Sequence, residues 1–281
     1  MIKIEKDFNQ PPATLASEAC RAKVKQAIEE QQGHSFSSDY YRAVDVCEAL
    51  TTLYAGKCAY CEGSVLVYYE IEHYRPKKAG YYWLGYAWSN LLIACRHCNG
   101  RKGTQFPLEP DGKHIAFTGD PADDLQADCF RADKGLLQAE KPLLLNPEID
   151  DPNDHLAFRP DGSIHGKTWR GKETIRICGL DTDGMKKERK KIKDALVVRI
   201  NRATDEFRAE KTSNEAYLIR LRDVFHDLTA AGEKAHAYSC FGKTSAQQFS
   251  DFFLEGMATE RRKTILEAYR RFKKKFLKEP S

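Results

Sequence analysis

The sequence predicts an α+β protein, in which a small core that contains a strand is embedded in a mainly helical chain. Three observations favour this class. Apolar residues recur at helical spacing near both ends of the chain, whereas residues 65–73 alternate in the manner of a strand. Two Cys-x-x-Cys pairs enclose that strand. The length of 281 residues is enough for one large domain or two small ones.

The N-terminal segment, residues 1–56, is predicted to hold two helices. The first covers residues 14–32, and the second begins at Ser38, whose hydroxyl can cap it. Each helix has an apolar face, formed by Cys20, Val24 and Ile28 in the first and by Val44, Cys47, Leu50 and Tyr54 in the second. We expect the cysteines on these faces to be buried thiols.

The next segment, residues 57–108, carries the two cysteine pairs. A Cys-x-x-Cys pair spans one tight turn, so two pairs can direct four thiolates at a single ion. In a reducing compartment such pairs indicate metal ligands before they indicate disulfides. The sequence therefore predicts a structural Zn²⁺ site formed by Cys58, Cys61, Cys95 and Cys98.

Two further segments follow this core. Residues 109–180 are acidic and rich in loops, and Asp161-Gly162 predicts a short hairpin. Residues 181–281 return to helical periodicity, with three apolar stripes. The stripes are formed by Ile192, Leu196, Ile200, Ala203 and Phe207, by Leu218, Leu221, Phe225 and Leu228, and by Ile265, Tyr269, Phe272 and Phe276.

Positive charge is concentrated in two blocks. Residues 57–102 have seven Lys and Arg against three Asp and Glu, and residues 181–281 have 23 against 16. Basic blocks favour polyanions such as nucleic acid, although a solvated helix face also explains them. No stretch approaches eighteen consecutive apolar residues, and the N-terminus lacks the apolar part of a signal peptide. A cytoplasmic protein without a membrane segment is therefore predicted.

Polar residues inside the cysteine pairs follow a distinctive order. They read Glu-His-x-x-Pro, then Asn, then Cys-x-x-Cys-Asn-x-x-Lys, and comprise Glu72, His73, Pro76, Asn90, Asn99 and Lys102. This order resembles that of the HNH endonucleases of the ββα-metal (His-Me finger) class, in the variant whose two halves are held by four cysteines. The resemblance implies a small ββα-metal fold and hydrolysis of phosphodiester bonds.

The chemistry of that reaction explains the residue types. A base must deprotonate water, and a cation must neutralise the charge that develops on the phosphate and leaving oxygens. A histidine with a pKa near neutrality suits the base. Carboxylate and amide oxygens suit a hard ion such as Mg²⁺.

Carried over by position, the resemblance makes His73 the general base. It makes Glu72 and Asn99 the ligands of the catalytic divalent ion, Mg²⁺ or Mn²⁺. It makes Asn90 the middle asparagine, which braces the loop and orients the histidine, and it places Lys102 to contact phosphate. Glutamate instead of the commoner aspartate lengthens the reach to the ion. Asparagine instead of histidine at the last position weakens the case for a transition metal there.

A longer match, over roughly residues 58–190, points to one subfamily. The stretches that carry it are EHYRPKKAGYYWLGYAWSNLLIACRHCNGRKGTQFPL, LLLNPEIDDPNDHLAFRPDGSI and TIRICGLD. They resemble the PtuB-type HNH nucleases of Septu and retron-linked Septu-like anti-phage systems in bacteria. The resemblance implies a partner, the ABC-type ATPase PtuA. In retron-linked members it also implies a reverse transcriptase with its DNA–RNA product.

The predicted function is therefore a metal-dependent endonuclease that cuts DNA or RNA with a water activated at His73. A zinc-stapled nucleic-acid-binding or scaffold module without catalysis is the alternative. Such a module needs the cysteines, but it has no need of Glu72, His73 and Asn99 in register. A redox protein would require a thioredoxin-like βαβ pattern beside a reactive thiol, which the sequence lacks.

Overall fold

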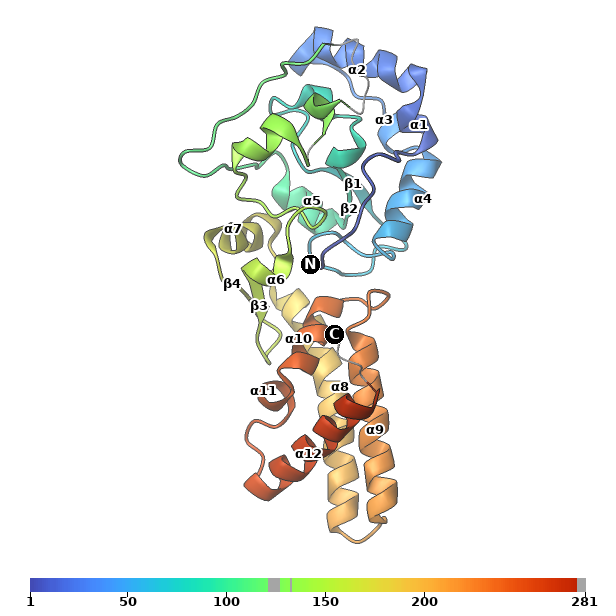
Figure 1. Cartoon of the computed structure of the whole chain (residues 1–281), viewed down its shortest axis with the longest axis vertical. Coiled ribbons are helices and arrows are strands. Elements are labelled where there is room, and N and C mark those ends of the chain that lie inside the picture. Colours follow the sequence, from blue (N-terminus) through green and yellow to red (C-terminus); the bar gives the residue numbers. More distant parts are fainter. Residues whose placement is uncertain (121–126, 132, 277–281) are drawn as a thin grey trace. The chain divides into compact units, whose positions relative to one another are not determined.

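The computed structural model describes residues 1–120, 127–131 and 133–276 (Figure 1). Parts of the predicted loop-rich segment, residues 121–126 and 132, and the last five residues of the predicted helical region lie outside the described residues. The chain divides into two compact units. The first comprises Met1–Leu156 with His165–Leu180, and the second comprises Ala157–Ile164 with Asp181–Ser281.

The first unit begins with short helices. They are α1 (Ala13–Ala16), α2 (Glu18–Glu30), the 3-10 turn η1 (Gln31–Gly33), α3 (Ser38–Tyr41) and α4 (Val44–Leu53). Each of the two predicted helices is therefore broken once. The hydroxyl of Ser17 accepts a hydrogen bond from the amide of Cys20 at 3.1 Å and starts α2. Ser37, not Ser38, caps α3, because its hydroxyl accepts from the amide of Asp39.

The buried face of α4 differs from the predicted one. Val46, Leu50 and Tyr54 are buried at a spacing of four residues, whereas Val44 is 73% exposed. Val44 is the first residue of α4, on its solvent side, so the ridge of i, i+4 and i+8 positions starts two residues later. Cys20 is a buried thiol as expected, but Cys47 is only partly buried.

The core of the first unit has two strands followed by a helix. Strands β1 (Glu70–His73) and β2 (Leu91–Ala94) pair antiparallel, with Glu72 opposite Leu92 and His73 opposite Leu91. Helix α5 (Arg96–Lys102) follows β2 directly. This small sheet and helix, within a chain that is otherwise mainly helical, confirm the predicted α+β class.

Strand β1 is shorter than the alternation of residues 65–73 predicts. Leu66, Val67 and Tyr68 are 70–84% exposed. Val65 is buried, and its amide bonds the carbonyl oxygen of Gly56 at 2.8 Å, which turns the chain back toward the cysteine turn. The exposed residues have no partner in β2, which is only four residues long, so they form a loop despite their strand-like pattern.

The rest of the first unit consists mainly of short elements. They are η2 (Tyr82–Leu84), η3 (Trp88–Asn90), η4 (Asp128–Phe130), η5 (Gly135–Glu140), α6 (Pro152–His155) and α7 (Trp169–Cys178). The predicted hairpin is present as β3 (Leu156–Phe158) and β4 (Ile164–Gly166), and its residues Ala157–Ile164 belong to the second unit. Gly162 has a φ of +86° in its turn, a conformation that glycine adopts readily.

Helices make up almost all of the second unit. They are α8 (Asp183–Arg208), α9 (Asn214–Ala231), α10 (Ser239–Gln247), α11 (Phe249–Phe253) and α12 (Thr259–Phe276). The long helices α8 and α9 lie side by side (Figure 1). Phe225 is buried at the centre of the second stripe, among the rings of Phe249, Tyr269 and Phe272. Among the described residues, no helix combines the length and the apolar character needed to cross a bilayer.

Candidate functional site

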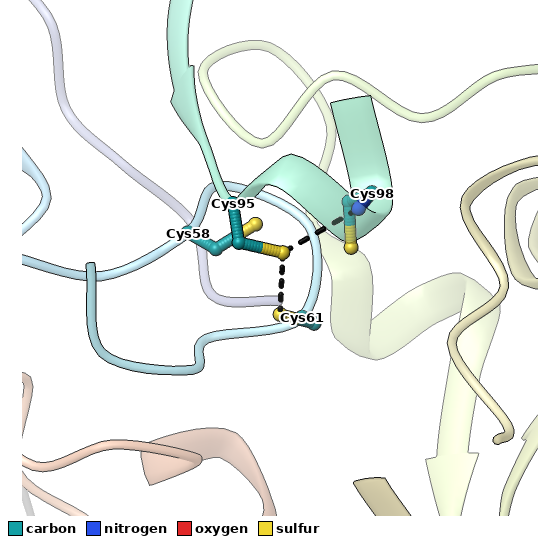
Figure 2. A group of neighbouring side chains, drawn as sticks. All are labelled: Cys58, Cys61, Cys95 and Cys98. Atoms are coloured by element: carbon teal, nitrogen blue, oxygen red, sulfur yellow. Dashed lines mark hydrogen bonds between the residues drawn. The ribbon is translucent and has the colours of Figure 1, made fainter. Parts of the chain in front are cut away.

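Four cysteine side chains converge where a tight turn meets the start of α5 (Figure 2). Their Sγ atoms all lie within 4.8 Å of one another, and they belong to Cys58, Cys61, Cys95 and Cys98. The Sγ atoms of Cys61 and Cys95 are 3.8 Å apart. Thiolates around a tetrahedral zinc ion, with Zn–S bonds of about 2.3 Å, are separated by about 3.8 Å. The cluster can therefore hold a metal ion, and its all-sulfur ligand set suits Zn²⁺.

Neighbouring groups stabilise negative charge on these sulfurs. The amide of Gly63 donates to the Sγ of Cys61, and the amide of Cys98 donates to the Sγ of Cys95, both at 3.4 Å. The thiols of Cys58, Cys61 and Cys98 donate to the same sulfur and lower the pKa of Cys95, whereas contacts within the cluster raise the pKa of Cys61 and of Cys98. Because the thiolate is the form that binds metal, the two backbone donors favour the ligand form of the site.

His73 is the last residue of β1, and its imidazole is nearly buried. Its Nε2 lies 2.9 Å from the carbonyl oxygen of Gly85. A carbonyl can only accept, so Nε2 carries the hydrogen and Nδ1 keeps its lone pair. Burial, together with the nearby charge of Lys77, lowers the pKa of His73 to about 3. The ring is therefore neutral at physiological pH, the form that can take up a proton.

Asn90 connects the segment after β1 with the segment before β2. Its side chain is buried; Oδ1 accepts from the amide of Arg75 at 2.8 Å, and Nδ2 donates to the carbonyl oxygens of Arg75 and Leu84. Leu84 precedes Gly85, whose carbonyl oxygen holds His73. Asn90 thus fixes the backbone against which the imidazole is oriented. Its role as the middle asparagine of the motif stays a prediction.

Glu72 and Lys102 form a buried ion pair. The Nζ of Lys102 contacts the Oε1 of Glu72 and also donates to the carbonyl oxygen of His73 at 2.9 Å. The hydroxyl of Tyr60 donates to the same Oε1 at 3.5 Å. Burial raises the pKa of Glu72, and the positive charge of Lys102 opposes this rise.

The position of Lys102 differs from the one expected of a phosphate contact. Its side chain is 0% exposed, because Lys102 is the last residue of α5 and turns back onto β1. An ion bound by Glu72 would have to share the carboxylate with this lysine. Glu72 and His73 are also successive strand residues, so their side chains leave β1 on opposite faces.

Asn99 lies in the middle of α5 and is half-buried. Its main chain belongs to the helix, and its carbonyl oxygen accepts from the amide of Gly103 at 2.8 Å. Within the described part of the chain, its side-chain amide makes no hydrogen bond. The structure therefore joins Glu72, His73 and Lys102 by direct contacts, and leaves the amide oxygen of Asn99 able to bind an added group.

Two residues beside His73 did not stand out in the sequence. The ring of Tyr41 lies edge-on to the imidazole with centroids 5.0 Å apart, and the Nζ of Lys77 lies 3.7 Å from the centre of the Tyr41 ring. Burial lowers the pKa of Lys77 to about 8. Lys77 is the first residue after the Glu-His-x-x-Pro pattern, and that position was the available sign of its importance. No feature of the sequence indicated the importance of Tyr41, since it belongs to α3, 32 residues before His73 along the chain.

Comparison with known families decides the nature of this core. The family model described as HNH endonuclease matches residues 58–105. The chain carries an HNH endonuclease domain. The matched stretch contains the four cysteines, both strands and α5. No solved structure matches the chain.

Curated relatives extend the similarity beyond the HNH domain. Septu protein PtuB of Bacillus mycoides (strain KBAB4) is 34% identical over 174 residues, which are 56% of this chain and 54% of the relative. Septu protein PtuB of Bacillus thuringiensis is 28% identical over 47% of this chain and 40% of its own length. Septu protein PtuA of Bacillus mycoides is 27% identical over 45% of this chain and 18% of its own length. At most, the chain spans about half the length of these relatives.

We expect metal analysis of the purified protein to find about one zinc ion per chain. Changing Cys95 to serine removes one of four sulfur ligands, so zinc content and melting temperature should both fall. Cys47→Ser is the matched control, because Cys47 lies outside the cluster. Equal zinc content in the Cys95→Ser variant and the wild type, measured by mass spectrometry, would contradict the assignment.

Lys102→Met should lower the free energy of unfolding by about 3–5 kcal/mol, because Glu72 would keep a buried charge without a partner. The double variant Lys102→Met/Glu72→Gln should regain most of that loss, since it removes both charges. Lys78→Met, at an exposed position, serves as the control. Urea denaturation measures all four proteins. A double variant no more stable than Lys102→Met would show that the pair is not the cause.

Proposed function

We propose that this protein is a metal-dependent endonuclease that hydrolyses phosphodiester bonds of DNA or RNA. The observation that carries the proposal is the state of His73 within the HNH domain. Its ring is neutral, its Nε2 is held by Gly85, and its Nδ1 keeps a lone pair. A histidine held in this way offers its free lone pair to water, but the burial that lowers its pKa weakens it as a base, so the proposed reaction requires the site to open and the pKa to rise toward neutrality.

In the proposed reaction, Nδ1 of His73 takes a proton from a water molecule, which attacks the phosphorus atom. The bond to the leaving 3′ oxygen breaks as that oxygen takes a proton from solvent water, and His73 returns its proton to solvent. The products carry 5′-phosphate and 3′-hydroxyl ends, as the HNH resemblance implies. Asn90 acts through the backbone by holding the loop that orients the imidazole. Tyr41 covers the ring in the described conformation, so the substrate must displace it.

The catalytic divalent ion, Mg²⁺ or Mn²⁺, would be held by Glu72 and Asn99. The ligand set fits such an ion, because a carboxylate and an amide oxygen are both hard donors. When bound, the ion would neutralise charge that develops on the phosphate. Lys102 would then balance the charge of Glu72 from within the protein. Lys77, which is only half-buried, would contact the phosphate in place of Lys102.

We further infer a role in anti-phage defence with a PtuA-type ABC ATPase as partner. The similarity to two proteins named Septu protein PtuB supports it. A segment similar to this chain also lies within a protein named PtuA, and most of that protein is outside the match. Two segments that are joined in one polypeptide are suited to act together when they occur as separate chains. A retron reverse transcriptase with its DNA–RNA product is a further candidate partner, by the family resemblance alone.

The alternative is a zinc-bound nucleic-acid-binding or scaffold module without catalysis. The buried pairing of Glu72 with Lys102 is the observation that favours it, because this acid has a structural role without any ion. A module of this kind would bind nucleic acid without cutting it.

The deciding assay incubates labelled duplex DNA, single-stranded DNA and structured RNA with the full chain. Mg²⁺, Mn²⁺ or EDTA is added, with and without a PtuA-type ATPase. We expect metal-dependent cleavage that His73→Ala reduces at least about a hundredfold, since general-base catalysis contributes on that order. Lys78→Ala is the control at an exposed site. Absence of cleavage in every condition, including with the ATPase, would favour the nucleic-acid-binding module without catalysis.

A further inference from the structure

The last two turns of α12, in the second unit, carry a dense cluster of positive charge. Residues 270–275 include five cationic side chains, of which four are exposed and one is half-buried. Within the part of the chain that the structure describes, none of the five forms an ion pair with a carboxylate. This α12 cluster consists of Arg270, Arg271, Lys273, Lys274 and Lys275.

The other basic run of the second unit, at the start of α8, is neutralised by the protein itself. Arg189 is buried, with its guanidinium against the ring of Phe158. Four lysines form ion pairs with nearby carboxylates, and they are Lys186, Lys190, Lys191 and Lys193. Two runs that look alike in the sequence therefore differ in the structure, and only the α12 cluster leaves its charge for an external partner.

A cluster of this kind is unfavourable for the isolated helix. Arg270 and Lys274 are like charges four residues apart, and so are Arg271 and Lys275, an arrangement that destabilises a helix. The helix dipole attracts cations to the last turn, but it supplies only roughly half a negative charge there and cannot offset five positive ones. The charge balance therefore favours a bound polyanion.

The α12 cluster borders a groove of about 430 Å³ between α9 and α12. Arg222 of α9 and Arg271 and Lys275 of α12 place three cations on its walls, against the single acid Glu267. Phe276, which is 42% exposed, lies on the same groove. Ligand sites start at about 300 Å³, so the groove has room for one nucleotide. Cations beside an exposed aromatic ring are the combination that binds the phosphates and bases of single strands.

We propose that the α12 cluster binds the phosphate backbone of an unpaired nucleic-acid strand, with one base in the groove beside Phe276. A lipid surface fits less well, because the apolar face of α12 is buried within the second unit and cannot enter a bilayer. That face consists of Ile265, Tyr269 and Phe272. That the bound strand is also the substrate rests on the proposed nuclease function, whereas binding itself does not.

Fluorescence anisotropy with a short labelled single strand and the full chain tests the proposal. No Mg²⁺ or Mn²⁺ is added, so that the strand stays intact. We expect Arg271→Gln/Lys274→Gln to weaken binding at least about tenfold at 0.1 M salt. The slope of log affinity against log salt should become shallower by about 1.4, because each phosphate contact of a single strand contributes about 0.7. The melting temperature should not fall, since the change relieves repulsion within the helix.

The matched control is Lys190→Gln/Lys191→Gln, which removes the same charge from paired positions of α8 and should leave the affinity unchanged. Phe276→Leu should weaken binding of the single strand and leave binding of a duplex of the same sequence unchanged, since only an unpaired base can stack on the ring.

Polyglutamate and vesicles that contain phosphatidylserine are the competing polyanions, and weaker binding of both than of the strand would support the proposal. Equal losses in the α8 and α12 variants, or no loss in the α12 variant, would overturn it. So would a duplex, polyglutamate or vesicles bound as tightly as the single strand. Anisotropy requires no cleavage, so failure here is distinct from failure of the nuclease proposal.

Discussion

Four sulfur atoms gathered at one point hold the HNH core together. Two strands of four residues and a helix of seven bury too little apolar surface to be stable alone. The cysteine cluster joins the turn at Cys58 and Cys61 to the start of α5 at Cys95 and Cys98. The cysteine cluster thereby holds α5 against β1. The position of α5 in turn sets the positions of Asn99 and Lys102 relative to His73. We therefore expect metal binding and folding of the core to be coupled.

Charged side chains inside and beside this core are held in buried pairs. Lys102 neutralises Glu72, and Glu140 neutralises Arg75, all with almost no exposure. Pairs of this kind contribute little net stability, but losing one partner is costly, so they favour a single arrangement of the strands and loops. The imidazole of His73 is fixed in the same way, by a backbone carbonyl instead of a charge.

The sequence was sufficient for features that depend on spacing. The cysteine pairs, the glycine turn at Gly162 and most of each helical stripe in the second unit were predictable, because each follows from neighbours a few residues apart. Two residues assigned to the stripes are wrong: Leu218 is 40% exposed and Phe276 is 42% exposed, since both lie at the edge of the apolar face near a helix end. Long-range features were not. The loop of residues 66–68 has the pattern of a strand and lacks only a partner. The burial of Lys102 depends on Glu72, 30 residues earlier, and the cover over His73 depends on Tyr41 from α3.

The catalytic ion is the feature on which the proposed chemistry depends most. Titration of the zinc-loaded protein with Mn²⁺, followed by electron paramagnetic resonance, measures it without any substrate. We expect one bound Mn²⁺ per chain in the wild type and in His73→Ala, and its loss in Asn99→Ala, because Asn99 is the proposed ligand with a free side chain. Absence of an ordered Mn²⁺ site, or a site unaffected by both Asn99→Ala and Glu72→Gln, would contradict the proposed catalytic centre.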